Sequence, residues 1–436
     1  MTSPASGQQL PGTKAPSSST GKNGSVEFLR FLFTSVIILF HINLDLWDQG
    51  KVAAVVGGVP VAFFHHGNLG VEFFFLVTGF LMAGSVWKEI SRDRGQELPL
   101  RGSSTGNRRP EFSPRELSQR DISARDISAR DDLLLLPGRT IRFITHKIDA
   151  LFPYYLPACL LTPLVRLLTG RTLNTEYFLR RIPSLFFLQR LGLGRPIIGC
   201  TWYLSSMLIA LAFAYPLCRL FSRAYTHVVG PVLCAVILCA LVFYTGSLGD
   251  IEDWFLFTYK TNLRAFAEIS MGAAGFELTR FLSGKKYNRL TRVLLSAAAI
   301  VSLALSAAYI CSFADNIWSL PVFLLLFIAV VITFSGEGAL SRAGVFSHPF
   351  FLYLGSISLP MYVTQTLMRM YVPWRFAACS PEVQCFLIYF GILVLAVVMH
   401  AAVTRAENIV KNRRPAHSLP HKAHSGRLST FTHLFS

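Results

Sequence analysis

Two ionisable residues in one apolar stretch could do chemistry together. Arg30 and His41 lie near the two ends of the segment VEFLRFLFTSVIILFHINLDLW. A helix rises about 1.5 Å per residue, so the two side chains would lie about 16 Å apart along the axis, roughly half of a bilayer core. Their spacing is about three full helical turns, so both side chains point to nearly the same face of the helix. Ionisable residues in a spanning helix usually face the protein interior, and they indicate a functional site.

Each of the two residues also has a purely structural interpretation. Arg30 could extend to the lipid headgroups, and His41 could be a neutral histidine at the far interface. Glu72, at the start of the next apolar segment, favours the functional interpretation. Because that segment runs in the opposite direction, Glu72 returns to the level of His41. A carboxylate can orient an imidazole and stabilise its protonated form, so we predict His41 as a general base with Glu72 as its partner.

The fold class follows from composition. The chain has 436 residues, of which 52% are apolar and only 15% are charged. Many segments approach the length of an apolar span, so we expect an all-α polytopic membrane protein of about ten transmembrane helices. In the expected sixth span, Arg264 and Glu268 are four residues apart, which predicts an ion pair on one face of a helix.

The chain divides into a membrane domain and two polar tails. Residues 1–24 are rich in Ser, Gly, Pro and Thr and are expected to be disordered, and residues 405–436 form a basic, disordered tail. Residues 25–404 form the membrane domain, whose first span is retained because no cleavage site follows it. Within this domain, residues 88–138 contain the repeat QRDIS-ARDIS-ARD. A period of five fits neither helix nor strand, so we predict a low-complexity cytoplasmic loop without a catalytic role.

The net charge of +17 is compatible with nucleic-acid binding, but the basic residues lie in loops and tails between apolar spans. This distribution is typical of the positive-inside rule, so no nucleic-acid partner is predicted and both termini are expected in the cytoplasm. One loop disagrees. Residues 169–199 carry five arginines yet fall on the outer side by this count. Either a half-span is miscounted there, or the loop is a structured element with a function.

Neither the cysteines nor the tail histidines predict a metal site. The eight cysteines contain no CxxC pair, and most lie in apolar stretches, where Cys behaves as a small hydrophobe. The histidines of the tail, from His417 to His433, are irregularly spaced. Cys379 and Cys385 flank an expected outer loop and could form a disulfide in an oxidising compartment.

Four motifs in chain order resemble the membrane-bound acyltransferase family 3, whose bacterial members O-acetylate surface sugars. The resemblance covers most of the chain from Val26 to about Val403. The motifs are Arg30 and His41 with ten residues between them, the run GVEFFFLVTGFL from Gly70 to Leu81, Trp202-Tyr203-Leu204-Ser205, and Leu354-Gly355-Ser356-Ile357-Ser358 followed by Tyr362.

The resemblance implies transfer of an acyl group, usually acetyl, from acetyl-CoA at the cytoplasmic side to a hydroxyl of a cell-surface or exported glycan. It also implies a place in the bacterial inner membrane, with membrane lipids, acyl-CoA and a glycan or lipid-linked oligosaccharide as partners. Arg30, Arg142 and Lys147 are the candidates to hold the phosphates or thioester of the donor. Trp202 and Tyr203 are the candidates to contact the acceptor. Neither the acceptor nor the oligomeric state is specified.

The chain departs from the family pattern at three places. Ala150 stands where an Arg is expected before the third helix, and Arg139 and Arg142 are candidates to replace it. Gln365 stands where His is frequent. Apolar residues, Met207 and Leu208, occupy the region where a Glu often follows the Trp motif. These departures concern the donor and acceptor contacts more than the class of reaction.

Two other functions are compatible with about ten helices and buried charges. One is a flippase or transporter for a glycolipid or polysaccharide. Transporters of this size often contain internal repeats, and the sequence has no second Arg-to-His helix or duplicated half. The other is a membrane sensor in which His41 acts as a pH switch.

Overall fold

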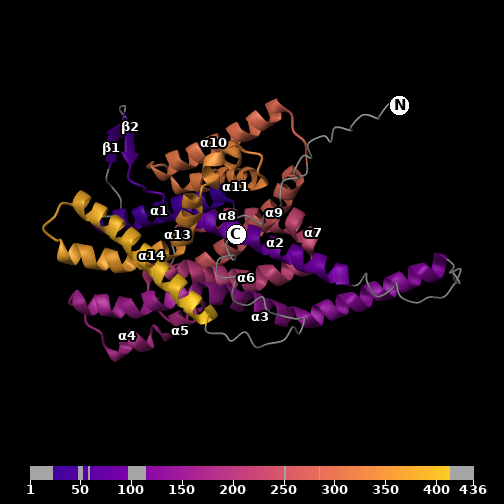
Figure 1. Ribbon diagram of the computed structural model, residues 1–436, viewed down its shortest axis with the longest axis horizontal. Coiled ribbons are helices and arrows are strands. Elements are labelled where there is room, and N and C mark those ends of the chain that lie inside the picture. The colour runs from indigo at the N-terminus through magenta and orange to yellow at the C-terminus, as the bar shows by residue number, and fades with distance from the viewer. Residues whose placement is uncertain are drawn as a thin grey trace, which may run out of the picture.

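The computed structural model describes residues 23–47, 53–56, 59–96, 114–249, 252–283 and 285–412. The tail histidines and nearly all of the two predicted tails lie outside these residues. The described chain is a bundle of helices with two short antiparallel hairpins, β1–β2 and β3–β4 (Figure 1). The predicted all-α class is therefore confirmed.

The α-helices and β-strands have the following bounds. In chain order they are α1 Gly24–Leu46, β1 Ala53–Val56, β2 Val59–Ala62, α2 Leu69–Gln96, α3 Pro114–Leu168, α4 Thr175–Leu179, α5 Ile182–Leu185, α6 Trp202–Leu220, α7 Ser222–Ala224, α8 Gly230–Thr245, β3 Trp254–Phe255, β4 Thr258–Tyr259, α9 Lys260–Ser283, α10 Arg289–Ile310, α11 Ser319–Ser335, α12 Ala339–Arg342, α13 Pro349–Arg375 and α14 Pro381–Asn412.

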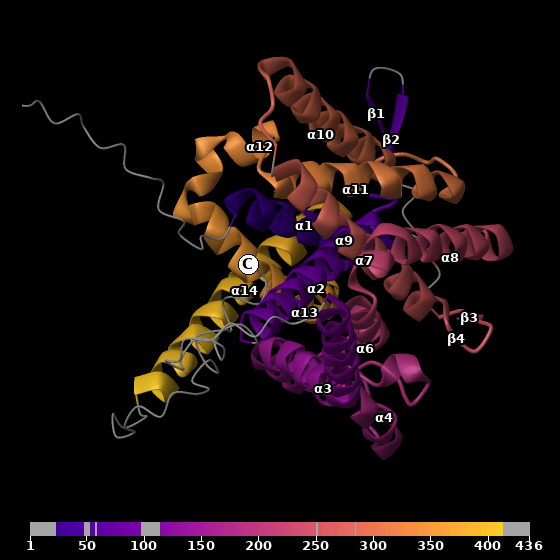
Figure 2. The same ribbon diagram turned by 90° about the vertical axis from the view of Figure 1, so that its right-hand side faces the viewer.

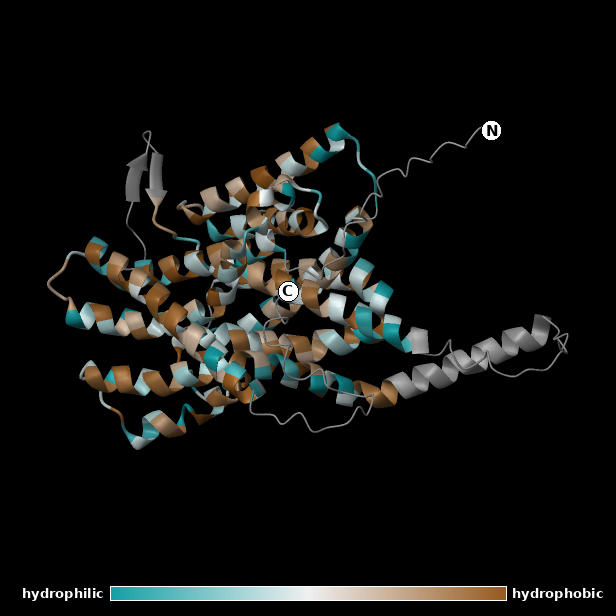
Figure 3. Cartoon of the chain, viewed as in Figure 1, coloured by the Kyte–Doolittle hydropathy of each residue, from teal (hydrophilic) through white to brown (hydrophobic). Residues whose placement is uncertain are grey.

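Eight helices of the described chain are long and apolar enough to cross a membrane. Apolar residues dominate the middle of these helices, and hydrophilic residues gather towards their ends (Figure 3). Helices α9 and α13 have similar lengths, 24 and 27 residues, but they are not among these eight. The structure therefore shows an integral membrane fold, while the predicted number of ten spans is not confirmed.

The central helices carry the candidate residues, and the outer helices carry apolar surface. Figure 2 places α1, α2 and α9 near the middle of the bundle, with α8, α10 and α14 around them. In the apolar windows of α1 and α2, 61% and 67% of the residues are buried, against 22% in α14. Large exposed side chains such as Phe243 and Phe386 are suited to lipid.

Local signals fix several helix ends. The side chain of Asn23 accepts a hydrogen bond from the backbone N–H of Ser25 at 3.0 Å, which caps the start of α1. Helix α8 ends at Gly246, whose φ of 71° is a left-handed conformation that glycine adopts without strain. Because α1 starts beside its cap, its first turn includes Glu27, three residues before Arg30.

Glycines set the distance between α2 and α9. A Cβ added to Gly79 would lie 1.9 Å from the carbonyl oxygen of Ile269, and one added to Gly272 would lie 2.1 Å from that of Leu76. Each helix thus presents a glycine to the backbone of the other, which is the usual device for close packing of helices in membranes.

Replacing Gly272 by alanine is therefore expected to destabilise the protein by about 1–3 kcal/mol, because two backbones would have to separate. Thermal unfolding of purified protein in a neutral detergent measures the effect. Gly138→Ala is the matched control, since a Cβ at Gly138 in α3 meets no atom within 4 Å. Equal melting temperatures for the two variants would contradict the close packing.

The prediction of a loop at residues 88–138 is wrong where the structure describes this segment, because most of it is helical. Helix α2 continues to Gln96, and α3 already begins at Pro114. The repeat lacks an apolar stripe, but it directly precedes a spanning segment. Extending an existing helix costs much less than nucleating a new one, so such a segment can be helical without a packed face of its own.

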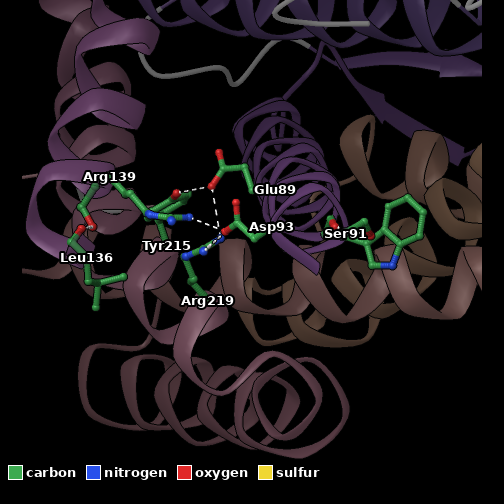
Figure 4. Close-up of polar contacts among 9 residues, drawn as sticks. Glu89, Ser91, Asp93, Leu136, Arg139, Tyr215 and Arg219 are labelled. Atoms are coloured by element: carbon green, nitrogen blue, oxygen red, sulfur yellow. Dashed lines mark hydrogen bonds and ion pairs between the residues drawn. The ribbon is translucent and has the colours of Figure 1, made fainter. Parts of the chain in front are cut away.

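A charged cluster joins the C-terminal ends of α2 and α6 to the middle of α3. Arg139 of α3 and Arg219 of α6 both donate to Asp93 of α2, each at 2.6 Å. The hydroxyl of Tyr215 donates to Glu89 at 2.6 Å, and Figure 4 shows the two carboxylates facing these partners. The cluster holds one end of the bundle together.

Residues 169–199 form a structured element, as one of the two interpretations of this loop required. The segment contains α4, α5 and two short 3-10 turns. The side chain of Asn174 caps α4 through the N–H of Tyr177 at 2.8 Å. The hydroxyl of Tyr155 in α3 donates to the carbonyl of Ser184 at 2.7 Å, which attaches the segment to the bundle.

The possible disulfide between Cys379 and Cys385 is not formed, and all eight cysteines are free thiols. Cys385 lies inside α14, where its side chain packs against the apolar cluster that α14 shares with α1 and α13.

Candidate active site

Helices α1 and α13 lie side by side and run in the same direction. His41 Nδ1 lies 3.0 Å from Gln365 Oε1, and one turn further along Arg369 Nη2 donates to Asp45 Oδ1 at 2.7 Å. Residue numbers increase together along both helices, so the two pairs hold the helices in one register.

The contact with Gln365 fixes the proton on His41. The amide nitrogen of Gln365 donates to the carbonyl of Tyr362 at 2.9 Å, which directs its carbonyl oxygen Oε1 towards His41. A carbonyl oxygen only accepts, so Nδ1 of the imidazole must carry the hydrogen. The other ring nitrogen, Nε2, then has the lone pair that a general base needs.

Arg30 is held by its own helix. Its Nη1 donates to Glu27 Oε2 at 2.8 Å, and both side chains are buried. Glu27 in turn lies against α13 at Gly355, where an added Cβ would be 1.8 Å from Oε2. The glycine of the fourth sequence motif therefore makes room for the carboxylate that positions Arg30.

Arg30 lines a narrow cavity of about 40 Å³ in the middle of the bundle. This volume holds about two or three water molecules. Its α1 residues, Arg30, Thr34 and Ile37, lie on the face that continues to His41, which agrees with the predicted shared face. The other helices contribute Val71, Phe74, Leu151, Tyr203, Leu204, Met207, Ser358, Leu359 and Tyr362.

A second, smaller cavity adjoins the first. Leu151 and Met207 line both, and the second also contains Lys147 and Ala150. The ammonium group of Lys147 lies 5.3 Å from the centre of the Phe143 ring. Lys147 thus supplies a positive charge beside Ala150, the position at which the sequence departs from the expected Arg. Lys147 and Arg30 therefore line neighbouring cavities, and His41 lies further along the α1 face that lines the first.

The prediction that Glu72 pairs with His41 is wrong, because Glu72 binds Arg264 instead. Glu72 Oε1 accepts from Arg264 Nη2 at 2.9 Å, and Arg264 Nε donates to Glu268 at 2.9 Å. The three side chains are each 1% exposed or less, and they lie between α2 and α9. The spacing prediction for Arg264 and Glu268 is therefore confirmed, while the orienting contact to His41 comes from Gln365.

The other candidates lie in different surroundings. Tyr203 lines the central cavity, and its ring lies 5.9 Å from that of Tyr362. Trp202 is buried beneath the Arg190 guanidinium, 5.9 Å from the ring centre. Arg142 is exposed on α3 and lines neither cavity.

Gln365 is the site residue that the sequence did not identify as functional. It stands where the family often has His, so it was a departure from the pattern and not a candidate. The available signal was its position three residues after Tyr362, close to one helical turn, which places both on one face of α13.

Comparison with known proteins identifies the family. A profile described as an acyltransferase domain matches residues 23–403, which include both helices of the His41 pair and both cavities. Searches of curated proteins and of solved structures give no significant match. Eight helices of the described chain are long and apolar enough to span a membrane, and the profile matches most of the sequence, so the chain belongs to the membrane acyltransferase family 3.

Proposed function

We propose that this protein transfers an acetyl group from acetyl-CoA to a hydroxyl of a cell-surface or exported glycan. The observation that carries the proposal is the His41–Gln365 contact, which lies about one helical turn beyond Ile37 and Tyr362 in the lining of the Arg30 cavity. It supplies a base with a defined proton and a cation on the same helix face. The family match supports an acyltransferase, and the acetyl donor and glycan acceptor are the proposed refinement.

In this proposal, His41 Nε2 removes the proton of the acceptor hydroxyl while its oxygen attacks the thioester carbonyl carbon. The new C–O ester bond forms, the C–S bond breaks, and the imidazolium returns the proton to the departing CoA sulfur. Gln365 keeps Nδ1–H in place throughout. Arg30, about three helical turns from His41, and Lys147 attract the phosphates of CoA.

The position of Lys147 suggests the side from which the donor arrives. Figure 1 shows the start of α3 and the end of α2 at one end of the bundle, and the β1–β2 hairpin and the α13–α14 connection at the other. The charge distribution favours the first end as cytoplasmic. Acetyl-CoA would then enter past Lys147, and the acceptor would approach His41 from the opposite side of a bacterial inner membrane.

Transfer of label from radioactive acetyl-CoA in membrane vesicles tests the proposal. An acetyltransferase labels the glycan fraction, and the label depends on the amount of this protein. A flippase moves unmodified glycolipid across the vesicle membrane without acetyl-CoA. Movement of glycolipid without labelling would replace the proposal by the transporter function.

Replacing Gln365 by leucine is expected to lower kcat about tenfold or more, because the imidazole loses the acceptor that fixes its tautomer. The KM for acetyl-CoA should stay within about twofold, since Gln365 lies away from Lys147. Gln365→Glu keeps an oxygen acceptor and should retain most of the activity. Gln384→Leu on α14, where Gln384 donates to the Cys379 carbonyl, is the matched control. Equal kcat in the two leucine variants would contradict the positioning role.

A further inference from the structure

A large polar cavity lies apart from the central site, between the 169–199 segment and the β3–β4 hairpin. Its volume is about 680 Å³, within the range of about 300–1,000 Å³ typical of ligand sites. We call it the arginine cavity, because its lining includes Arg180, Arg190 and Arg195, together with Gln189, Glu252 and Tyr259. Helix α4 lies at the same end of the bundle as the β1–β2 hairpin (Figure 1).

Arg190 is a built-in part of this cavity and not a mobile surface residue. It is only 3% exposed, and its guanidinium lies 4.9 Å from the Tyr259 ring centre. Its Nη2 donates to Glu252 at 3.0 Å, and its backbone carbonyl accepts from Asn262 at 2.8 Å. The Tyr259 ring and Glu252 position the guanidinium at the cavity wall, and Asn262 holds the backbone of Arg190.

Two buried polar atoms at this wall have no hydrogen-bond partner. They are Nε of Arg190 and Oε1 of Gln189, whose amide nitrogen donates to the Thr201 carbonyl at 3.0 Å. Buried polar groups are nearly always hydrogen-bonded, so two unpaired atoms on consecutive lining residues leave this wall with unused hydrogen-bonding capacity. The donor suits an anion, and the acceptor suits a hydroxyl.

Positive charge exceeds negative charge in the cavity. Arg180 pairs with Glu176 at 2.6 Å, but both side chains are more than half exposed, so the pair is weak. Arg195 makes no ion pair with any residue that the structure describes. Glu252 is the acidic residue of the lining.

The first turn of α6 separates the arginine cavity from the central cavity. Trp202 lies against Arg190, and the next two residues, Tyr203 and Leu204, line the central cavity. Ser205, the last residue of the Trp motif, accepts from the backbone N–H of Arg190 at 3.2 Å. A ligand anchored at Arg190 would therefore lie one helical turn away from the cavity that Arg30 lines.

We propose that the arginine cavity binds a phosphate or carboxylate group of the acceptor, so that the acceptor is an acidic glycan. This inference rests on the proposed acetyl transfer to a glycan and names its acceptor class. The charged group binds the arginines, a neighbouring hydroxyl donates to Gln189, and the hydroxyl to be acetylated extends towards His41. The phosphate of a lipid headgroup has the same chemistry, so the test separates the two sources.

Binding of fluorescent tetrasaccharides to the purified chain in phosphatidylcholine nanodiscs tests the proposal without acetyl-CoA. A polyuronate and a phosphorylated tetrasaccharide are compared with a neutral one of the same length. We expect saturable binding of at least one acidic probe, weakened by added salt, and no binding of the neutral probe. Arg195→Gln should raise the Kd about tenfold, since it removes charge-assisted hydrogen bonds.

Two variants serve as controls. Arg171→Gln removes the same charge from the same segment but outside the cavity lining, so the Kd should stay within about twofold. His41→Ala should bind like the parent, so failure of catalysis and failure of this site remain distinguishable. Equal binding of acidic and neutral probes, absence of binding by either acidic probe, or equal losses for the two arginine variants would overturn the proposal. Arg195-dependent displacement of the probe by phosphatidylglycerol nanodiscs would assign the site to lipid headgroups instead.

Discussion

Replacing His41 by alanine is expected to lower acetyl transfer about 10²- to 10⁴-fold, the contribution of a positioned general base. The imidazole is the group whose Nδ1–H is held by Gln365 and whose Nε2 is left to accept a proton. The measurement is kcat for transfer from acetyl-CoA in membranes that carry equal amounts of parent and variant. The KM for acetyl-CoA should change little, because Arg30 and Lys147 remain.

The control for this prediction is His227→Ala. It removes an exposed imidazole whose Nδ1 lies 2.9 Å from the Arg223 carbonyl oxygen, outside the central site. It should keep activity within about twofold. Melting temperatures of both variants show whether either change disturbs the fold. Activity of His41→Ala within about twofold of the parent, in a folded protein, would contradict the role of His41 as the base.

Replacing Arg264 by methionine is expected to destabilise the protein by about 3–5 kcal/mol, the usual cost of leaving buried charge without its partner. Arg264 binds both Glu72 and Glu268 at 2.9 Å and also donates to the Leu248 carbonyl at 2.9 Å. Unfolding of the purified protein in neutral detergent measures the loss. The oxygens that Arg264 satisfies would be orphaned between α2 and α9.

Arg280→Met on the same helix is the matched control. Its side chain is 43% exposed and pairs with Glu277 at 3.1 Å, so its loss should cost about 1 kcal/mol or less. Replacing Glu72 and Glu268 by leucine in the Arg264→Met background should recover much of the stability, because no buried charge then remains. Equal losses for the Arg264 and Arg280 variants would contradict the structural role of the buried cluster.

The membrane fold and the α1 face were predictable because they depend on local sequence. Apolar length identifies spans directly, and the spacing of Arg30 and His41 fixes their common face within a single helix. The pairing of Arg264 with Glu268 follows from the same helical geometry. Each of these predictions needs only the residues of one element.

The partner of His41 was not predictable from sequence, because it depends on how helices rotate against each other. Glu72 has the right depth in α2, but depth does not determine direction around the helix axis. Gly79 and Gly272 bring α2 close to α9, and this contact turns Glu72 towards Arg264. Gln365 is far from His41 in the chain, and only the parallel packing of α1 and α13 brings them together.

The extent of α2 and α3 was also underestimated, for a related reason. A search for an apolar stripe detects helices that pack along one face, and residues 114–132 have no such stripe. They continue a helix whose stability comes from the spanning segment that follows. The charged cluster around Asp93 then holds the C-terminal ends of α2 and α6 against the middle of α3.

The most direct test of the central claim is the chemical fate of the acetyl group. Vesicles containing this protein are incubated with radioactive acetyl-CoA and a glycan fraction, and the glycan is then treated with mild alkali. The proposed reaction predicts label in the glycan that alkali releases as acetate, because the product is an ester, and no such label with His41→Ala. Label that resists alkali, or alkali-labile label that persists with His41→Ala, would contradict acetyl transfer to a hydroxyl by this site.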